Sequence, residues 1–569
     1  MNQKGFEGRI LTRNRVVYIR DTLRVSPNMS ASESAKSEHI CRVNGNHLGD
    51  CPIDEYESQL SRKLATLQSL FPSFPAADIE VFRSPPIYHR NRANFNVWRD
   101  QRGDERPEGM YYAMWDAKES SEQSVTHGTA GMSKKQRKIA RFEQKAPQKQ
   151  PCEVTEFPRG TALINSLMKD VLLYLREQDP DGKSHAAKSS LLRKELFEVR
   201  FVTTQLQEAI AVLIYHCPLN AKAWCDAAMG LITWLQRPGS GCAQQPGAIK
   251  VVGRARRQKL FVSSLGSSIE DDQKDSAEKV TLENLEKELI TEQYRVNGQK
   301  FRNYQIEGAF SQPNAVVCQH MLEWSVACTG TAYEHNCPGV SASEARRAKI
   351  SEAALCIRTE EDLVELYCGG GTFTSPLSRN FRGVLATELS KASVVLAKKA
   401  FTDNGISNVT IAPVSAEDFS DMYLKFLASR EKNVAFSGGN LGHTGSVPGI
   451  TNLNIFNNIS TVFVDPPRAG CDDATCALLA RFDKICYISC NPETLARDVA
   501  KITAIVGPGT SSATGKDKTR LYRHKIVRMA AFDQFPYTHH LEGGVMLVKE
   551  LVPDALEPIV GAKRPLDAN

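Results

Sequence analysis

The second half of the chain alternates short apolar runs with longer segments of helical periodicity, and this alternation restricts the fold more than any other feature. The runs are LVELY (363–367), VLATE (384–388), TVFVD (461–465) and ICYIS (485–489). Strands separated by helices are typical of an α/β fold with a parallel, doubly wound sheet. Such a sheet binds ligands beyond the carboxyl ends of its strands. Functional side chains are therefore expected directly after these four runs.

The length of 569 residues, with 41% hydrophobic and 24% charged residues, indicates a globular protein with more than one domain. Ordered sequence is expected to begin near Asp54, with a helix marked by Tyr56, Leu60, Leu64, Leu67 and Leu70. We predict an extension at 1–50, a first domain at 51–310 with insertions near 117–150 and 263–290, a second domain at 311–552 with insertions near 329–347, 433–455 and 505–520, and a tail at 553–569.

The formal charge of +6 is small for this length, so any binding of nucleic acid must come from local basic patches. Fifteen cysteines without a paired CxxC set indicate neither a disulfide framework nor a zinc site, and they favour a reducing, cytoplasmic location. No apolar run approaches the roughly 20 residues of a membrane span. The basic bias of the first thirty residues is also seen in mitochondrial transit peptides, which leaves that compartment as an alternative.

A glycine turn follows the first apolar run, in the sequence YCGGGT (367–372). Three glycines allow a tight turn and a close approach of a ligand to the backbone. The second run ends in Glu388, whose carboxylate can accept hydrogen bonds from both ribose hydroxyls of a nucleoside. The turn lacks the spacing for a pyrophosphate and the Lys-Ser/Thr pair for a triphosphate, so S-adenosylmethionine is favoured over a dinucleotide or ATP. The alternative is a structural turn beside a surface glutamate.

Two polar motifs follow the next two runs: DPPR (465–468) and SCNPET (489–494). A cysteine between a strand and a helix start can have its thiolate favoured by the helix amides, and we expect Arg468 nearby to add to this effect. A single cysteine among fifteen is more often structural, so Cys490 is a candidate because of the motifs around it.

The segment FDQFPYTHHLE (532–542) precedes an apolar strand, VMLV (545–548). His539 and His540 are adjacent, and on extended backbone such side chains point to opposite faces, so no shared metal is expected. Glu542 is better placed to act as a base, although an ordinary surface glutamate is the alternative.

Five motifs in order closely resemble the tRNA (uracil-5-)-methyltransferase family: FSQPN (310–314), ELYCGGG (365–371), VDPPRAG (464–470), SCNPETL (489–495) and FDQFPYTHHLEGG (532–544). The N-terminal half adds EVFRSP (80–85), YHRNRANFNVW (88–98), LFEVRFVTT (196–204), LIYH (213–216) and GRA (253–255). The resemblance implies an α+β RNA-recognition domain followed by a Rossmann-like domain that uses S-adenosylmethionine.

The resemblance also implies a role for individual residues. Cofactor-binding positions match Gln312, Tyr367, Glu388 and Asp465, with Thr372 where the family often has asparagine. Cys490 matches the nucleophile, Glu542 the base that removes the C5 proton, and Arg468 a residue beside the target uracil. Phe197 and His216 match RNA-contacting positions, although either side chain could be purely structural. The sequence departs from the family pattern at Gly370 and Thr372 in the glycine turn, and at Asn94 and Asn96 in the N-terminal motif.

Each residue type is required by a step of the implied reaction. Carbon 5 of uracil is a poor nucleophile, so a thiolate must first add at carbon 6, and a general base must later remove the C5 hydrogen. The resemblance implies the T-arm of tRNA as partner and uridine 54 as target, with no metal and a monomeric protein. Phosphate contacts are expected from Arg90, Arg92, Arg254, Arg256 and Arg257.

Three other functions remain open from the sequence. A uracil-5-methyltransferase of ribosomal RNA often carries an iron-sulfur cluster, and Cys41 and Cys51 do not have the spacing for one. A cytosine-5-methyltransferase is expected to have proline or threonine where Ser489 stands. A tRNA-folding chaperone, for which methylation is secondary, is the alternative from a different functional class.

Overall fold

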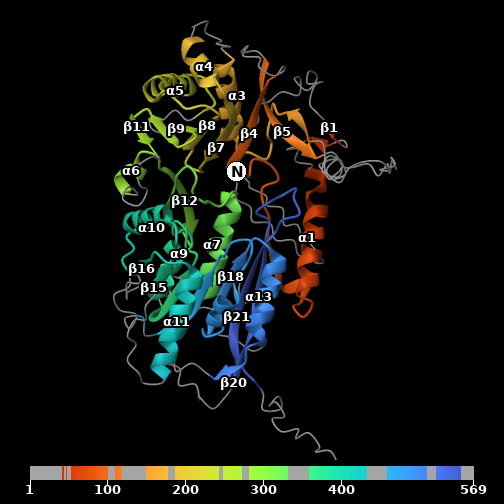
Figure 1. Ribbon diagram of the computed structural model, residues 1–569. Coiled ribbons are helices and arrows are strands. Elements are labelled where there is room, and N and C mark those ends of the chain that lie inside the picture. The colour runs from red at the N-terminus through yellow and green to blue at the C-terminus, as the bar shows by residue number, and fades with distance from the viewer. Residues whose placement is uncertain are drawn as a thin grey trace, which may run out of the picture. The chain divides into compact units, whose positions relative to one another are not determined.

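Two large β-sheets, each with helices packed on it, dominate the chain (Figure 1). The computed structural model describes residues 42–43, 46–47, 53–99, 109–117, 149–176, 186–242, 248–271, 281–330, 358–431, 456, 458–508 and 521–552. These all belong to one compact unit, Cys41–Asn569. The basic N-terminal stretch, Cys41 and Cys51, and most of the predicted insertions lie outside the described residues.

The first sheet has eight strands in the order β11-β10-β9-β8-β7-β4-β5-β6. Its strands are β4 (Arg92–Arg99), β5 (Met110–Ala117), β6 (Lys149–Glu153), β7 (Leu196–Thr203), β8 (Ala209–Tyr215), β9 (Ile249–Ala255), β10 (Gln258–Ser263) and β11 (Gly266–Asp271). Only β8 and β9 run parallel. The core of this sheet is shared with α3 (Ala162–Leu175), α4 (Ala186–Arg193) and α5 (Ala221–Leu235). This arrangement is the predicted α+β class, and β11 forms an edge strand within a predicted insertion.

The second sheet follows the order β16-β15-β14-β17-β18-β21-β20-β19. Its strands are β14 (Arg358–Leu366), β15 (Phe381–Thr387), β16 (Val409–Ala412), β17 (Ile459–Val464), β18 (Lys484–Ser489), β19 (Gly507–Pro508), β20 (Leu521–Phe532) and β21 (Glu542–Leu551). The strands β14 to β18 are parallel, and β21 is antiparallel to both β18 and β20. The predicted doubly wound sheet is confirmed, with an antiparallel hairpin added at one side.

Buried strands and covering helices explain the four apolar runs. In β17 and β18 every residue after the first is buried, as expected for a parallel sheet covered on both faces. The α-helices described in this half are α7 (Ala315–Thr329), α9 (Thr374–Leu377), α10 (Lys391–Asp403), α11 (Ala416–Glu431), α12 (Asp473–Leu479) and α13 (Pro492–Ala504). Strand order reverses between β14 and β17, which places the expected ligand crevice at the carboxyl ends of these strands.

The predicted first helix is α1 (Tyr56–Leu70), and with β3 (Ile79–Phe82) it belongs to the second sheet rather than the first. Leu67 of α1 is fully buried in the core that contains Leu495 of α13. β3 runs parallel to β20, with Phe82 opposite Phe532. The predicted domain boundaries stay a prediction, but this N-terminal segment completes the C-terminal sheet.

Smaller elements of the described fold are β1 (Arg42–Val43), β2 (Asn46–His47), α6 (Leu282–Glu286) and the hairpin of β12 (Ile290–Val296) with β13 (Gln299–Gln305). Asn297 and Gly298 form the hairpin turn with φ of 48° and 78°. No helix in the described part of the chain is long and apolar enough to cross a membrane.

Candidate functional site

The glycine turn after β14 is held in place by Glu388 at the end of β15. Gly369 and Gly371 adopt φ of 56° and 78°, and Tyr367 a φ of 61°. The Gly369 amide donates to Glu388 Oε2 at 3.0 Å, and the Ser390 amide donates to Oε1 at 2.6 Å. Each carboxylate oxygen keeps a further lone pair, so Glu388 can still accept hydrogen bonds from a ligand.

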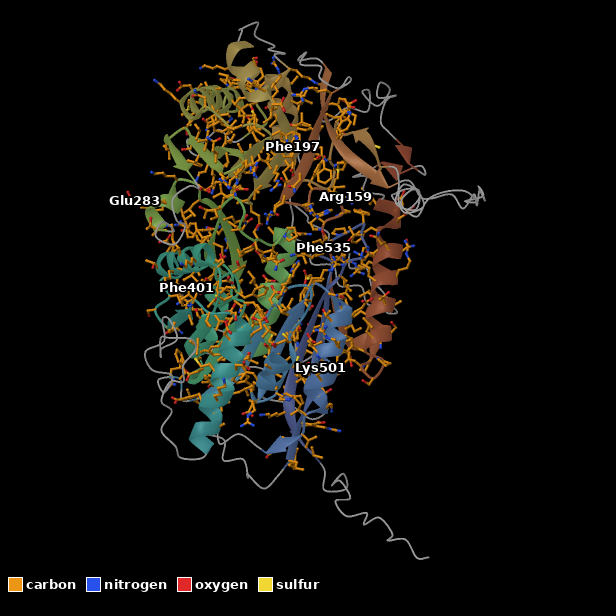
Figure 2. All side chains as sticks on the ribbon, viewed as in Figure 1. Arg159, Phe197, Glu283, Phe401, Lys501 and Phe535 are labelled. Carbon is orange, nitrogen blue, oxygen red and sulfur yellow. The ribbon has the colours of Figure 1, made fainter. Side chains whose placement is uncertain are left out.

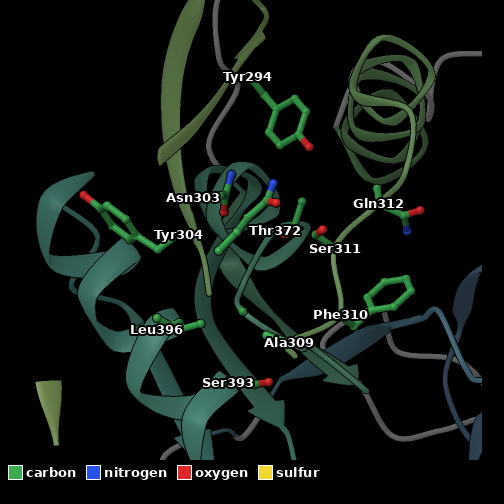
Figure 3. Close-up of a pocket in the computed structure, with 12 residues that line it drawn as sticks. Tyr294, Asn303, Tyr304, Ala309, Phe310, Ser311, Gln312, Thr372, Ser393 and Leu396 are labelled. Atoms are coloured by element: carbon green, nitrogen blue, oxygen red, sulfur yellow. The ribbon is translucent and has the colours of Figure 1, made fainter. Parts of the chain in front are cut away.

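A pocket opens between this turn, the β12–β13 hairpin, the segment 309–312 and α10 (Figure 3). It is lined by Tyr294, Asn303, Tyr304, Gln305, Ala309, Phe310, Ser311, Gln312, Gly370, Thr372, Ser393 and Leu396. Two predicted cofactor residues, Gln312 and Thr372, are therefore in its wall. Tyr367 and Asp465 are not, and the Tyr367 hydroxyl donates to Glu417 Oε1 at 3.3 Å.

Cys490 and Glu542 meet at the carboxyl end of β18. Ser489 pairs with Gly543 in the antiparallel ladder between β18 and β21, so the residues one step beyond, Cys490 and Glu542, are neighbours. Cys490 is half-buried, whereas Glu542 is 3% exposed. The Glu542 Oε2 atom has no hydrogen-bond partner within the described structure. The structure thus brings together the two predicted catalytic residues.

Asp465 lies on the neighbouring strand end and is hydrogen-bonded to one of a pair of glutamines. It follows β17, the strand beside β18. Gln312 Nε2 donates to Asp465 Oδ2 at 3.3 Å, and Gln534 Nε2 donates to Gln312 Oε1 at 2.7 Å. The sequence had not singled out Gln534, although it lies inside the motif FDQFPYTHHLEGG. These amides link the pocket wall to the Asp465 carboxylate.

The electrostatics of the site differ from the sequence-based expectation. Burial raises the pKa of Asp465 to about 7, and burial together with Asp465 holds the pKa of Glu542 well above its usual range. The pKa of Cys490 is raised to about 11 by burial and by these two carboxylates, and Arg468 opposes this shift only in part. Arg468 lowers the pKa of Cys490 as predicted, but burial above all, and the two carboxylates after it, outweigh this effect, so the net shift disfavours the thiolate.

Arg468 lies on an exposed turn next to Cys490. Its carbonyl accepts from Asn491 Nδ2 and Thr494 Oγ1, both at 3.4 Å, and its guanidinium contacts His540 Nδ1 at 3.2 Å. The rings of His539 and His540 are 3.9 Å apart in a turn, so the expectation that they point to opposite faces is wrong. Among the described residues, no three His, Cys, Asp or Glu side chains are arranged so that they could hold a metal ion together.

Asp498 of α13 fixes this turn, and sequence reasoning missed it. The carboxylate Oδ2 accepts from the Cys471 amide and the Tyr487 hydroxyl, each at 2.8 Å. An added Cβ on Gly470 would lie 2.5 Å from the same oxygen, so only glycine fits there. The sequence signal that could have identified Asp498 is the position of this acidic residue on the apolar helix face formed by Leu495 and Val499.

The predicted RNA contacts lie on the first sheet. The rings of Phe197 on β7 and His216 after β8 stack with centroids 3.9 Å apart and planes 10° apart (Figure 2 labels Phe197). Phe197 is half-buried and His216 exposed. They form an aromatic platform on the surface.

The five predicted phosphate-binding arginines have different surroundings. Arg254 pairs with Glu307 at 3.0 Å, and Arg92 donates to Ser311 Oγ at 3.3 Å. Arg90 Nε donates to the Arg92 carbonyl. Arg256 and Arg257 are exposed. The last two are therefore the freest to meet a ligand.

A doubly wound sheet with a glycine turn, a facing acid and a cysteine among carboxylates defines a Rossmann-like α/β enzyme. The family model described as tRNA (Uracil-5-)-methyltransferase matches residues 55–141, 132–270, 273–336 and 349–550. The chain belongs to the tRNA (uracil-5-)-methyltransferase family, and the predicted family and enzyme class are confirmed.

Two relatives and one solved structure are similar to this chain. A tRNA/tmRNA (uracil-C(5))-methyltransferase of Cellvibrio japonicus is 33% identical over 508 residues, which are 88% of this chain and 98% of that protein. The protein of the same name from Saccharophagus degradans is 34% identical over 505 residues, 88% and 99% of the two chains. The structure of Pyrococcus abyssi tRNA (uracil-54, C5)-methyltransferase with S-adenosyl-L-homocysteine is 16% identical, covers 90% of this chain and 92% of its own, and has a TM-score of 0.46.

Proposed function

We propose that this enzyme methylates carbon 5 of the T-loop uridine 54 in tRNA, with Cys490 as a covalent nucleophile and S-adenosylmethionine as methyl donor. The observation that carries the proposal is the neighbouring position of Cys490 and Glu542, with Asp465 on the adjacent strand end. The relatives that span nearly the whole chain are named for the same reaction on tRNA and tmRNA. A thiol beside carboxylates matches the two chemical demands of that reaction, an addition and a proton removal.

The pocket has the unpaired polar groups that a nucleoside-like cofactor needs. The side-chain amides of Asn303 and Gln305 line it, are 4% and 6% exposed, and retain polar atoms without hydrogen-bond partners in the described structure. Buried polar atoms of this kind call for a ligand or water, because leaving them unpaired is costly. We assign the cofactor to this pocket and to Gln312, Thr372, Tyr367, Glu388 and Asp465.

S-adenosylmethionine supplies an electrophilic methyl group on a positively charged sulfur. The remaining chemistry falls to the chain's own residues. The Cys490 thiol must lose its proton, and Asp465, with a pKa of about 7, can accept protons near neutral pH. When bound, the positively charged sulfonium of S-adenosylmethionine, held near Asp465, would stabilise the negatively charged thiolate of Cys490 and so make its formation easier.

The Cys490 thiolate then forms the Sγ–C6 bond, which makes C5 nucleophilic toward the methyl group. Glu542 afterwards takes the C5 proton, the C5=C6 double bond returns, and the Sγ–C6 bond breaks to release the thiolate. The buried Glu542 carboxylate is a stronger base than an exposed one because burial raises its pKa.

A base inside a tRNA loop reaches a half-buried thiol only when it leaves its stack. We assign the stacked pair of Phe197 and His216 to the bases left behind, since aromatic rings stack on unpaired bases. Arg468, on the exposed turn beside Cys490, is assigned to the target uracil.

The test is a methylation assay with labelled S-adenosylmethionine and unmodified tRNA, comparing wild type, Cys490→Ala and a transcript whose T-loop uridine 54 is cytidine. We expect label only with wild-type protein and the uridine transcript. Cys217→Ala is the matched control, because Cys217 is also half-buried but follows β8 on the first sheet. Label in the Cys490 variant would refute the covalent mechanism, and label on the cytidine transcript would refute the site. An inactive wild-type protein would instead favour methylation of ribosomal RNA or a tRNA-folding chaperone role.

A further inference from the structure

The segment 533–541, called here the hairpin loop, joins β20 to β21 and leads directly into Glu542. Phe532 and Glu542 face each other in the ladder of these two strands, so the loop begins and ends at the same point of the sheet. Its first amide, of Asp533, donates to the Phe82 carbonyl of β3 at 3.0 Å. The position of the Glu542 carboxylate therefore depends on how this loop is held.

Lys63 of α1 holds the start of the hairpin loop at two points. Its Nζ donates to Asp533 Oδ1 at 2.7 Å and to the Phe535 carbonyl at 2.9 Å (Figure 2 labels Phe535). The side chains of Lys63 and Asp533 are 4% and 1% exposed. A buried ion pair is poorly screened, and losing one partner leaves an uncompensated charge. Loss of the Lys63 charge would therefore destabilise the loop in this position.

The same helix also packs beside the residue that follows Glu542. Leu67 of α1 lies against Gly543, where an added Cβ would be 3.8 Å from Leu67 Cδ1. Gln534, the residue after Asp533, donates to Gln312 and thus belongs to the chain of amides that ends at Asp465. A displaced Asp533 would therefore shift Gln534 next to it and, through the loop, Glu542.

A third route runs through Tyr56 and Ser84. The Ser84 amide donates to the Tyr56 hydroxyl at 3.0 Å, and Asn314 Nδ2 donates to Ser84 Oγ at 2.7 Å. Asn314 caps α7 two residues after Gln312. α1 is thus fastened to the loop and to the pocket wall by separate hydrogen bonds.

We propose that Lys63 is a positioning residue for the proposed methylation, acting through the hairpin loop to aim the Glu542 carboxylate at the C5 proton of the methylated uridine adduct. This inference rests on the proposed function. In that step the proton passes to Glu542, the C–H electrons restore the C5=C6 bond, and the Sγ–C6 bond breaks with the electrons returning to Cys490. Lys63 touches none of these atoms.

The experiment separates the last step from the earlier ones. Lys63→Met and Glu542→Gln are incubated with unmodified tRNA and S-adenosylmethionine, and the protein–RNA adduct is measured on a denaturing gel beside free methylated tRNA. A misplaced base slows release, so Lys63→Met should form free product about 100-fold more slowly while the adduct accumulates as in Glu542→Gln. The KM values for tRNA and cofactor should stay near those of wild type.

Two further double variants distinguish a loss of positioning from a loss of folding. Lys63→Met/Asp533→Asn removes both buried charges, and melting and cofactor calorimetry verify its fold; we expect it to accumulate the adduct as well. The matched control is Arg83→Met/Glu57→Gln, because that pair also joins α1 to the segment after β3 but is 49% and 64% exposed. We expect this control to turn over like wild type.

Each outcome decides between the two proposals. The positioning role would be overturned if Lys63→Met turned over like wild type. It would also be overturned if both Lys63 variants lost product without accumulating the adduct. Either result would leave the proposed function intact. Absence of an adduct in Glu542→Gln would remove the assigned base. A wild-type protein that methylates no uridine would overturn the function and the positioning role together.

Discussion

Replacing Gly371 by alanine should destabilise the protein more than any ordinary turn substitution. Its φ of 78° lies in the left-handed region, which costs an L-residue about 1–2 kcal/mol. The new Cβ would also lie 2.7 Å from Phe401 Cε1 and 3.3 Å from Ala397 Cβ of α10 (Figure 2 labels Phe401). Crowding a packed site adds about 1–3 kcal/mol. The free energy of unfolding should therefore fall by about 2–5 kcal/mol.

Gly298 is the matched control for this substitution. It has the same φ of 78°, but no atom lies within 4 Å of an added Cβ. Gly298→Ala should therefore show only the backbone cost of about 1–2 kcal/mol. Guanidinium unfolding of both variants measures the difference, and cofactor calorimetry shows whether the glycine turn still binds. The Gly371 variant should lose affinity because the Gly369 amide and Glu388 move with the turn.

Equal losses of stability in the two variants would refute this reasoning, because the contact with Phe401 is the feature that separates the two sites. A double-mutant cycle with Phe401→Leu gives a second check. Since leucine lacks the ring atoms that crowd the new Cβ, the cycle should show a favourable coupling between the two substitutions.

Three other predictions follow from the charges and rings described above. Asp465→Asn should gain stability relative to wild type as the pH rises from 4 to 8, measured as the free energy of unfolding in urea titrations. The pKa of the wild-type Asp465 carboxyl is about 7, above its usual 3.8, so the folded state favours the protonated carboxyl. The stability that this preference gives to the folded wild type is complete below pH 4 and is lost as the pH rises through 7. A constant difference would contradict this. Phe197→Ala should weaken tRNA binding by about 1–3 kcal/mol in filter assays and leave cofactor affinity unchanged, whereas unaltered tRNA affinity would remove its assigned role. Arg257→Gln should reduce the slope of log K against log salt by about 0.7–0.9, while Arg254→Gln, which loses its pair with Glu307, should lower stability with a smaller change in slope.

Local sequence signals predicted the catalytic sheet well because they depend on short-range physics. Buried parallel strands need continuous apolar runs, and all four runs correspond to strands β14, β15, β17 and β18. Gly369 and Gly371 have the positive φ that a three-glycine turn suggests. Helix α1 matches the spacing from Tyr56 to Leu70.

Contacts between residues far apart in the sequence could not be predicted from local patterns. The buried partners Lys63 and Asp533 are 470 residues apart, and no local pattern selects one lysine from many. The raised pKa of Cys490 comes first from burial and then from Glu542 and Asp465, and only the order of the strands brings these two carboxylates near. The contact between the His539 and His540 rings arises because the chain turns there instead of extending.

The pairing of β3 with β20 also determines when the second sheet can form during translation. Glu80 of β3 and Arg528 of β20 bond across 448 residues, so the early strand leaves the ribosome long before its neighbour exists. At ordinary rates of translation this wait lasts roughly 20 to 90 s. During that time the apolar face of α1, including Leu60 and Leu67, has no core to enter. The nascent chain must keep this helix from aggregating, and the catalytic sheet can close only after its last strands have been made.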